Sequence, residues 1–285
     1  MNLRSISISR RTVAVAASLA AMVWLAIGAH AALNKRAVDA RAFAAEQSVE
    51  AADKPSRIAL VIGNGHYPDA GTPLTQPIND ARGLTAALRH DGFDVDVVED
   101  ASGDDMARAI GRLRQKIRPD SVVMLFFGGY GIQVGRESYM IPVDATIWRE
   151  SDVRRHGISI ESVLEAMKEQ GARAKLVVLD ASRRNPYERR FRAFSHGLAP
   201  ISAPANALIL TSATPGKVAD DGDGANSVLM TQLLTNLAAQ QAPAETLFNR
   251  TRVTIARSSE GEQVPSVSSS LSEDVRLGAN ENTGG

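Results

Sequence analysis

The sequence predicts an α/β fold in which helices cover both faces of a largely parallel β-sheet. Five short runs are apolar on both of their faces, and they span 57–63, 93–100, 121–129, 175–181 and 206–213. Segments in which apolar residues recur with the helical period separate these runs. Strands that are apolar on both faces and alternate with amphipathic helices are typical of a parallel sheet buried between two helical layers.

The helices between the strands are predicted from the spacing of their apolar residues. A first helix is expected over 79–90, because Gly92 follows it as a stop signal. Two later helices each carry a one-sided apolar stripe, made of Met106, Ile110, Leu113 and Ile117 in one and of Ile160, Val163, Leu164 and Met167 in the other. Ser159 is placed to cap the second of them, because its hydroxyl can accept a bond from a first-turn amide.

Two parts of the chain depart from this alternation. Residues 131–145 alternate in polarity around Gly135, which predicts a hairpin carried on the sheet. After the last core strand the sequence predicts a loop over 219–226, helices over 228–237 and 244–256, and an edge strand near 264–277.

The N-terminus predicts a membrane-targeting helix. Arg4, Arg10 and Arg11 precede the 22 uncharged residues of 12–33, which reach roughly 33 Å as a helix and can cross a hydrocarbon core of about 30 Å. Residues 29–31 also fit the small-x-small pattern of signal-peptidase cleavage, so an uncleaved anchor and a cleaved signal peptide both remain open. Either way, the basic residues direct the rest of the chain across the inner membrane, so it is expected to be periplasmic or to face the periplasm from an anchor.

These patterns divide the chain into four parts. Residues 1–33 are the signal peptide or membrane anchor, 34–56 a linker, 57–277 the folded domain and 278–285 a disordered tail. Across the whole chain, 32 Lys and Arg residues balance 32 Asp and Glu residues, so net charge gives no attraction to nucleic acid. The chain has no cysteine, which excludes disulfides, thiolate metal sites and a cysteine nucleophile.

The residues just after the strands are the candidates for a functional site, because ligands collect at the carboxyl ends of strands in an open parallel sheet. Gly129 and Gly131 flank Tyr130 after one strand, where they allow a ligand to approach the backbone closely. Asp180 and Ser182 follow another strand.

Several motifs in the same order resemble the caspase and metacaspase family of cysteine peptidases, most of all its bacterial members. The family's first strand and turn resemble RIALVIGNGHY (57–67), and its next helix and strand resemble LTQPINDARGLTAALRHDGFDV (74–95). The family's histidine-bearing Ser-Gly-His-Gly motif falls at FFGGYG (126–131), and its Leu-Asp-Ala-Cys-Arg motif falls at LDASRRNP (179–186). The resemblance covers about 57–277 and implies a caspase-like three-layer sandwich.

The resemblance also implies that both catalytic positions are altered. Tyr130 stands in place of the general-base histidine, and Ser182 stands in place of the nucleophilic cysteine. A serine hydroxyl depends on an adjacent base, and a phenol with a pKa of about 10 is almost fully protonated at neutral pH. We expect Tyr130 to fill the space and to hydrogen-bond Ser182, and we expect Ser182 to bond locally as a turn residue.

Other residues are expected to retain a binding site. Asp180 aligns with the acidic residue that in metacaspase-like proteins lines the pocket for a basic side chain, although Arg183 and Arg184 could neutralise it. Gly129 and the backbone at Ser182 could keep a remnant of an oxyanion hole. Calcium, which metacaspases often require, could bind the acidic loop 220–226, but no cofactor is the main expectation. If a base were recruited from elsewhere, His156 would be the first candidate.

Three functions remain open at this point. The first is an exported pseudo-peptidase that binds basic peptide segments or protein partners without efficient hydrolysis. The second is a hydrolase that uses Ser182 as its nucleophile, with Tyr130 or another base. The third is a scaffold in the envelope whose cleft is vestigial.

Overall fold

The computed structural model describes residues 56–68, 73–187, 197–219, 222–239 and 242–278. The predicted membrane-targeting helix and the linker up to residue 55 lie outside these residues, as does the predicted tail from residue 279. Within the described ranges, no helix is long and apolar enough to cross a membrane.

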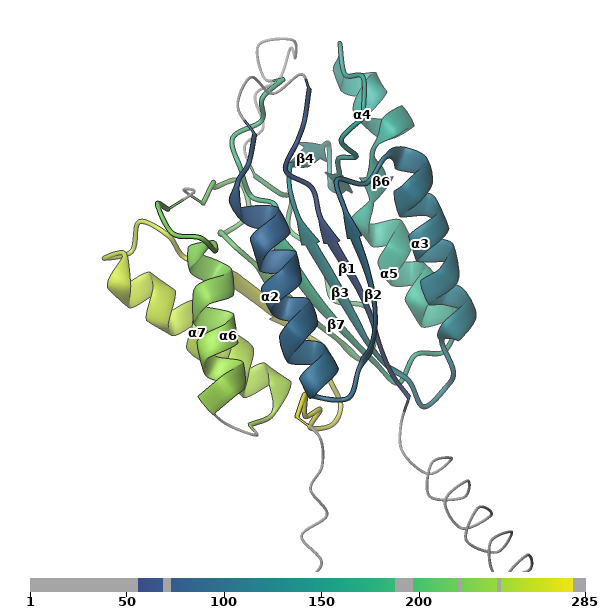
Figure 1. The fold of residues 1–285 in the computed structure, drawn as a ribbon, viewed down its shortest axis with the longest axis vertical. Helices are drawn as coiled ribbons and strands as arrows, with labels where there is room; N and C mark the ends of the chain where they lie inside the picture. The colour runs from purple at the N-terminus through teal and green to yellow at the C-terminus, as the bar shows by residue number, and fades with distance from the viewer. Residues whose placement is uncertain (1–55, 69–72, 188–196, 220–221, 240–241, 279–285) are drawn as a thin grey trace, which may run out of the picture. The chain divides into compact units, whose positions relative to one another are not determined.

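A six-stranded sheet forms the centre of the domain, in the order β2-β1-β3-β7-β8-β9 (Figure 1). Its strands are β1 (Arg57–Gly63), β2 (Asp94–Glu99), β3 (Val122–Gly128), β7 (Ala174–Asp180), β8 (Ala207–Thr211) and β9 (Ser266–Ser269). All neighbours pair in parallel except β9, which runs antiparallel to β8 at the edge. The predicted core strands and the predicted edge strand are therefore confirmed.

Helices cover both faces of this sheet, which confirms the predicted three-layer arrangement (Figure 1). One layer consists of α2 (Gln76–His90), α6 (Val228–Ala239) and α7 (Ala244–Ser258), and the other of α3 (Gly103–Lys116) and α5 (Ile160–Glu169). Neighbouring residues of one strand serve different layers, since Phe126 belongs to the first apolar cluster and Leu125 to the second. Burial on both faces explains why the inner strands β1, β3, β7 and β8 are mostly apolar.

The helix starts follow local chemistry. α2 begins at Gln76, earlier than predicted, because Pro77 falls at the first positions, where a missing amide removes no helical hydrogen bond. The predicted cap of α5 is confirmed, since the Ser159 hydroxyl accepts a hydrogen bond from the Ser162 amide at 3.2 Å.

The predicted hairpin exists, but the expectation that the main sheet carries it is wrong. β4 (Gly131–Val134) and β5 (Glu137–Met140) pair with the short strand β6 (Ile158–Ser159) in a separate three-stranded sheet. This small sheet and α4 (Glu150–His156) enclose their own apolar cluster, which includes Tyr130 and Ile147. Tyr130 therefore lies where the two sheets meet.

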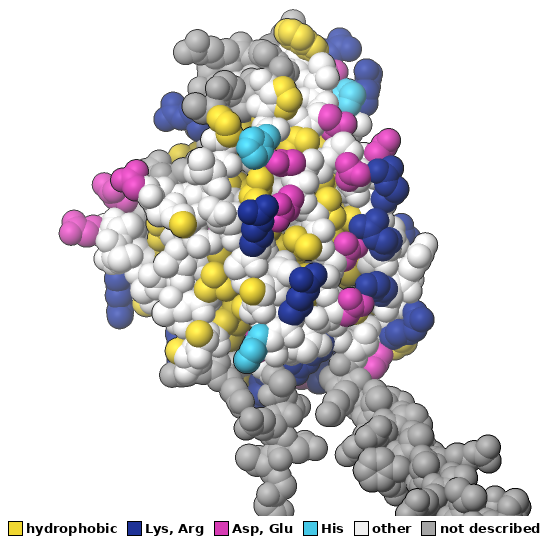
Figure 2. Space-filling view, viewed as in Figure 1, with side chains coloured by type: hydrophobic (Ala, Val, Ile, Leu, Met, Phe, Trp, Pro, Cys, Tyr) yellow, Lys and Arg dark blue, Asp and Glu magenta, His cyan; other side chains and the backbone are white. Residues whose placement is uncertain are grey.

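Charged side chains of both signs lie side by side over α2, β2 and α3 (Figure 2). The ion pairs there join Arg82 to Glu99, Arg112 to Asp96 and Lys116 to Asp94. Because β2 is an edge strand, these charges also oppose pairing with another chain. This face carries no extended surface of one sign.

Candidate active site

Strand register brings the two predicted site segments together. Gly128 at the end of β3 is the register partner of Asp180 at the end of β7. Beyond this pair, the Gly129 amide donates to the Asp180 carbonyl at 3.2 Å, and the Gly131 amide donates to the Ala181 carbonyl at 3.0 Å. Tyr130 and Ser182 thus follow neighbouring strand ends at the carboxyl edge of the parallel sheet.

Ser182 is buried, and its hydroxyl has no hydrogen-bond partner among the described residues. Only its backbone is engaged: the amide donates to Ser212 Oγ at 3.4 Å, and the carbonyl accepts from the Ala219 amide at 2.7 Å. The expected hydrogen bond from Tyr130 is therefore wrong, as is the expected local bond of a turn serine. The β7 end holds the backbone of Ser182 in place, while its hydroxyl lacks an accepting base.

Tyr130 is held by a second tyrosine that the sequence reasoning missed. The Tyr130 amide donates to the Tyr67 hydroxyl at 3.1 Å, and the two rings meet edge to face with centroids 4.8 Å apart. The Tyr67 hydroxyl in turn donates to the Ile141 carbonyl at 2.9 Å, and burial raises the pKa of this phenol far above its usual range. The position of the family's histidine is thus built into an aromatic cluster.

The described histidines do not supply a base to Ser182. His66 is exposed and pairs through Nδ1 with Asp100 at 2.6 Å, and His90 is exposed at the last turn of α2. His156 ends α4 and is also exposed. His196 lies outside the described residues. Within the described part of the chain, the Ser182 hydroxyl bonds to none of these side chains.

Gly129 and Gly131 pack closely against the neighbouring segments. A Cβ atom at Gly129 would lie 2.5 Å from the Tyr67 hydroxyl, and φ there is +155°; one at Gly131 would lie 2.8 Å from the Ala181 carbonyl oxygen. Since their amides are used between the strands, neither is directed at a ligand. The structure explains why glycine is needed at both positions, whereas their contact with a substrate stays a prediction.

Asp180 is buried beside Arg183. Its Oδ1 atom lies 3.5 Å from Arg183 Nη1, while Oδ2 has no partner among the described residues. Arg183 is itself buried and also donates to the Asp180 carbonyl and, at 3.1 Å, to the Gly129 carbonyl. Arg184 is exposed, so of the two arginines considered only Arg183 lies against the carboxylate.

A second buried carboxylate, Asp80 of α2, was not found from the sequence. Its Oδ1 atom accepts hydrogen bonds from Asn226 Nδ2 at 2.8 Å and from the Ser227 amide at 3.0 Å, whereas Oδ2 has no described partner. Burial, and then the charge of Asp180, raise the pKa of Asp80 to about 6. The sequence spacing could have indicated its burial. Asp80 precedes Leu84 and Leu88 at intervals of four residues, so it falls on the buried side of α2.

The acidic loop before α6 is fastened to the first turns of α2. We call its described part, Gly222–Ser227, the strap. Gln76 Nε2 donates to the carbonyls of Gly222 and Gly224, and Asn79 Nδ2 donates to that of Ala225 at 2.9 Å. No group of three or more His, Asp or Glu residues able to hold a metal occurs in the described ranges, and residues 220–221 lie outside them. Calcium binding by this loop stays a prediction.

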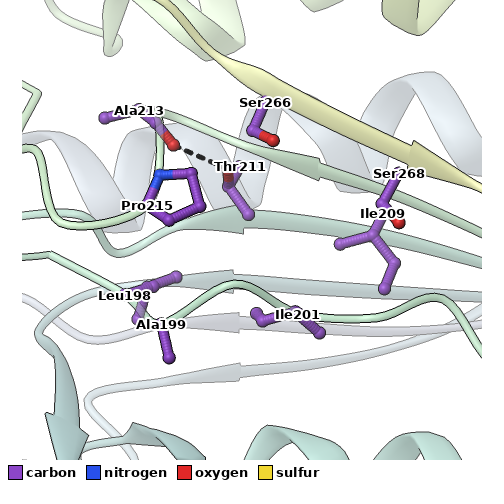
Figure 3. A pocket seen from close by; sticks show the side chains of 9 residues that line it. All are labelled: Leu198, Ala199, Ile201, Ile209, Thr211, Ala213, Pro215, Ser266 and Ser268. Carbon is purple, nitrogen blue, oxygen red and sulfur yellow. Dashed lines mark hydrogen bonds between the residues drawn. The ribbon is translucent and has the colours of Figure 1, made fainter. Parts of the chain in front are cut away.

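A small recess lies next to the site, between residues 198–201 and the strands β8 and β9 (Figure 3). Its walls are mostly apolar, and its few hydroxyls include that of Thr211, which donates to the Ala213 carbonyl at 2.8 Å. None of its side-chain polar atoms is both buried and without a partner. The buried polar atoms without described partners, among them those of Ser182, Asp80 and Asp180, thus lie outside this recess.

Comparison with known proteins identifies the family of this chain. The human mucosa-associated lymphoid tissue lymphoma translocation protein 1 is 27% identical over 144 residues, which are 50% of this chain and 17% of that protein. Its mouse homologue is 28% identical over 133 residues, which are 46% of this chain and 16% of that protein. The chain thus spans under a fifth of the length of these relatives. A family model described as "Caspase domain" matches residues 56–276, so this chain belongs to the caspase domain family.

Proposed function

We propose that this caspase-like domain is an exported pseudo-peptidase that binds basic peptide segments or protein partners without efficient hydrolysis. One observation carries the proposal. Among the described residues, the hydroxyl of Ser182 is buried without a base, whereas each of the two neighbouring carboxylates keeps one oxygen without a partner. The groups for catalysis are incomplete, and the groups for holding a cation are present.

The argument against hydrolysis rests on proton transfer. A hydroxyl becomes an effective nucleophile only when a neighbouring base accepts its proton. Ser182 has no such neighbour among the described residues, and a positioned general base alone is worth about 10²–10⁴ in rate. The additional exchange of a thiol for an alcohol lowers the expected turnover further.

The argument for binding rests on the cost of buried charge. An ionised carboxylate taken out of water is strongly destabilised unless a cation or hydrogen-bond donors compensate it. Asp180 has Arg183 on one side only, and Asp80 has two donors on one oxygen only. A cationic side chain that reaches the free oxygens would supply the missing partner. Both carboxylates are covered, so binding requires that cover to open.

The test uses the full chain with fluorescent peptides that differ only in carrying arginine, lysine or citrulline at one position. Anisotropy should show binding of the two charged peptides and not of the citrulline peptide, and mass spectrometry should show them uncut. Asp180→Asn should abolish binding. Asp96→Asn removes an equal charge from an exposed ion pair on β2 and should leave binding unchanged.

Two results would overturn the proposal. Turnover that Ser182→Ala abolishes would establish a serine hydrolase instead. Equal binding of partners by wild type and Asp180→Asn would leave the scaffold role as the better account.

The export that we propose is supported by Arg4, Arg10 and Arg11 before the uncharged run of 12–33. A reporter enzyme that is active only in the periplasm, fused after residue 285, should be active. Replacing the three arginines with glutamates should reduce this activity, because basic residues hold the N-terminus inside. An inactive reporter on a stably produced fusion would contradict export.

A further inference from the structure

A third acceptor without a partner accompanies the two carboxylates. Gln76 Oε1 is buried and has no hydrogen-bond partner among the described residues, as is true of Oδ2 in Asp80 and in Asp180. Gln76 and Asp80 lie one turn apart on the same side of α2, and both hydrogen-bond to the strap. Asp180 lies close enough to Asp80 for its charge to act on that carboxyl.

The strap determines which end of the Gln76 amide is free. Nε2 donates to the carbonyls of Gly222 and Gly224, and carbonyl oxygens can only accept. The amide therefore cannot be turned around without placing oxygen against oxygen. As a result Oε1 is directed away from the strap and is a fixed acceptor on α2, one turn before Asp80.

We propose that Gln76 is a specificity-determining residue: together with Asp80 and Asp180 it forms a cation site that prefers a guanidinium over an ammonium group. This inference rests on the proposed function and adds to it a residue outside the motifs that align with the family's catalytic positions. The proposed cation site then comprises three acceptors that come from two elements, α2 and β7.

The preference follows from donor geometry. A guanidinium carries five N–H groups spread around a plane, whereas an ammonium carries three on one atom. Asp80 Oδ1 already accepts two hydrogen bonds, and Asp180 Oδ1 lies beside Arg183. Neither carboxylate can therefore bind a guanidinium through both of its oxygens. The planar group can instead donate to Asp80, Asp180 and Gln76 from different edges. A lysine that reaches the carboxylates would leave Gln76 Oε1 without a donor in a buried place, which is unfavourable.

The experiment measures the affinity of the full chain for peptides that carry arginine, lysine or asymmetric dimethylarginine at one position. Wild type should favour arginine over lysine by on the order of tenfold or more, and dimethylation should weaken binding because it removes donors and keeps the charge. Gln76→Met should abolish the preference for arginine. Asn79→Ala is the matched control, since it removes one hydrogen bond to the strap and leaves Gln76 Oε1 in place.

The outcomes separate this inference from the proposed function. Equal affinity of wild type for arginine and lysine peptides would overturn the inference and leave the binding of basic segments standing. A preference that persists in Gln76→Met, or one that Asn79→Ala also abolishes, would overturn it as well. If wild type binds none of the charged peptides, the proposed function itself fails. If Gln76→Met does not fold, the binding of the dimethylarginine peptide to wild type still tests the inference. Binding of that peptide as tight as that of the arginine peptide would contradict the role of several N–H donors.

Discussion

Removing the charge of Asp80 should stabilise the unliganded protein at neutral pH. Asp80→Asn keeps an oxygen that can accept from Asn226 and from the Ser227 amide, and it places an NH₂ group where the oxygen without a partner now lies. That NH₂ group can donate toward Asp180. The substitution therefore removes the unfavourable charge with little change in shape.

The magnitude follows from the pKa of Asp80. Burial and Asp180 raise it from 3.8 to about 6. A change of this size corresponds to about 3 kcal/mol of destabilisation by the charged form. Because the pKa is raised in the folded state, the full stability is present below pH 3.8 and is lost as the pH rises through about 6.

The assay is urea unfolding of the full chain, followed by far-ultraviolet circular dichroism at pH 4 and at pH 7.5. Relative to wild type, Asp80→Asn should gain about 2.4 kcal/mol more at pH 7.5 than at pH 4, because pH 4 already lies just above the unfolded-state pKa of 3.8. Asp96→Asn, which removes a partly exposed, ion-paired surface carboxylate, should show a difference of less than about 1 kcal/mol. An Asp80→Asn variant with the same relative stability at both pH values, or one less stable than wild type at pH 7.5, would refute the reasoning.

Three further predictions concern the same edge of the sheet. Affinity for an arginine peptide should fall on the order of tenfold between pH 7 and pH 5, because Asp80, with a pKa of about 6, takes up a proton over that range; an affinity independent of pH would contradict this. Arg183→Met should destabilise the fold by about 3–5 kcal/mol in urea unfolding, since it leaves Asp180 buried without a cation; a loss below about 1 kcal/mol would show that the carboxylate is compensated otherwise. Gly129→Ala should lower the melting temperature measured by calorimetry, because its Cβ would lie 2.5 Å from the Tyr67 hydroxyl; an unchanged melting temperature would show that this contact relaxes freely.

The layered fold could be predicted because its signals are local. A run such as VVMLFFG (122–128) is apolar on both faces. Such a run is typical of a strand that is buried between two helical layers. The location of the site at the carboxyl edge of the sheet was also predicted from the sequence, because parallel strands end at the same edge. The register confirms it by pairing Gly128 with Asp180. Helix boundaries were predicted less accurately. The helix predicted over 79–90 begins at Gln76, one turn earlier than its sequence pattern indicated.

The sequence alone determined the domain's layers and the edge of the sheet at which Tyr130 and Ser182 lie, because periodicity and motif order are properties of short stretches. Only the tertiary structure decided which polar atoms acquire partners. Ser182 keeps a free hydroxyl, Asp80 approaches Asp180 from another element, and Gln76 binds carbonyls far along the chain. A hydrogen bond depends on the distance and angle between two particular atoms, and those are set only when distant segments have packed.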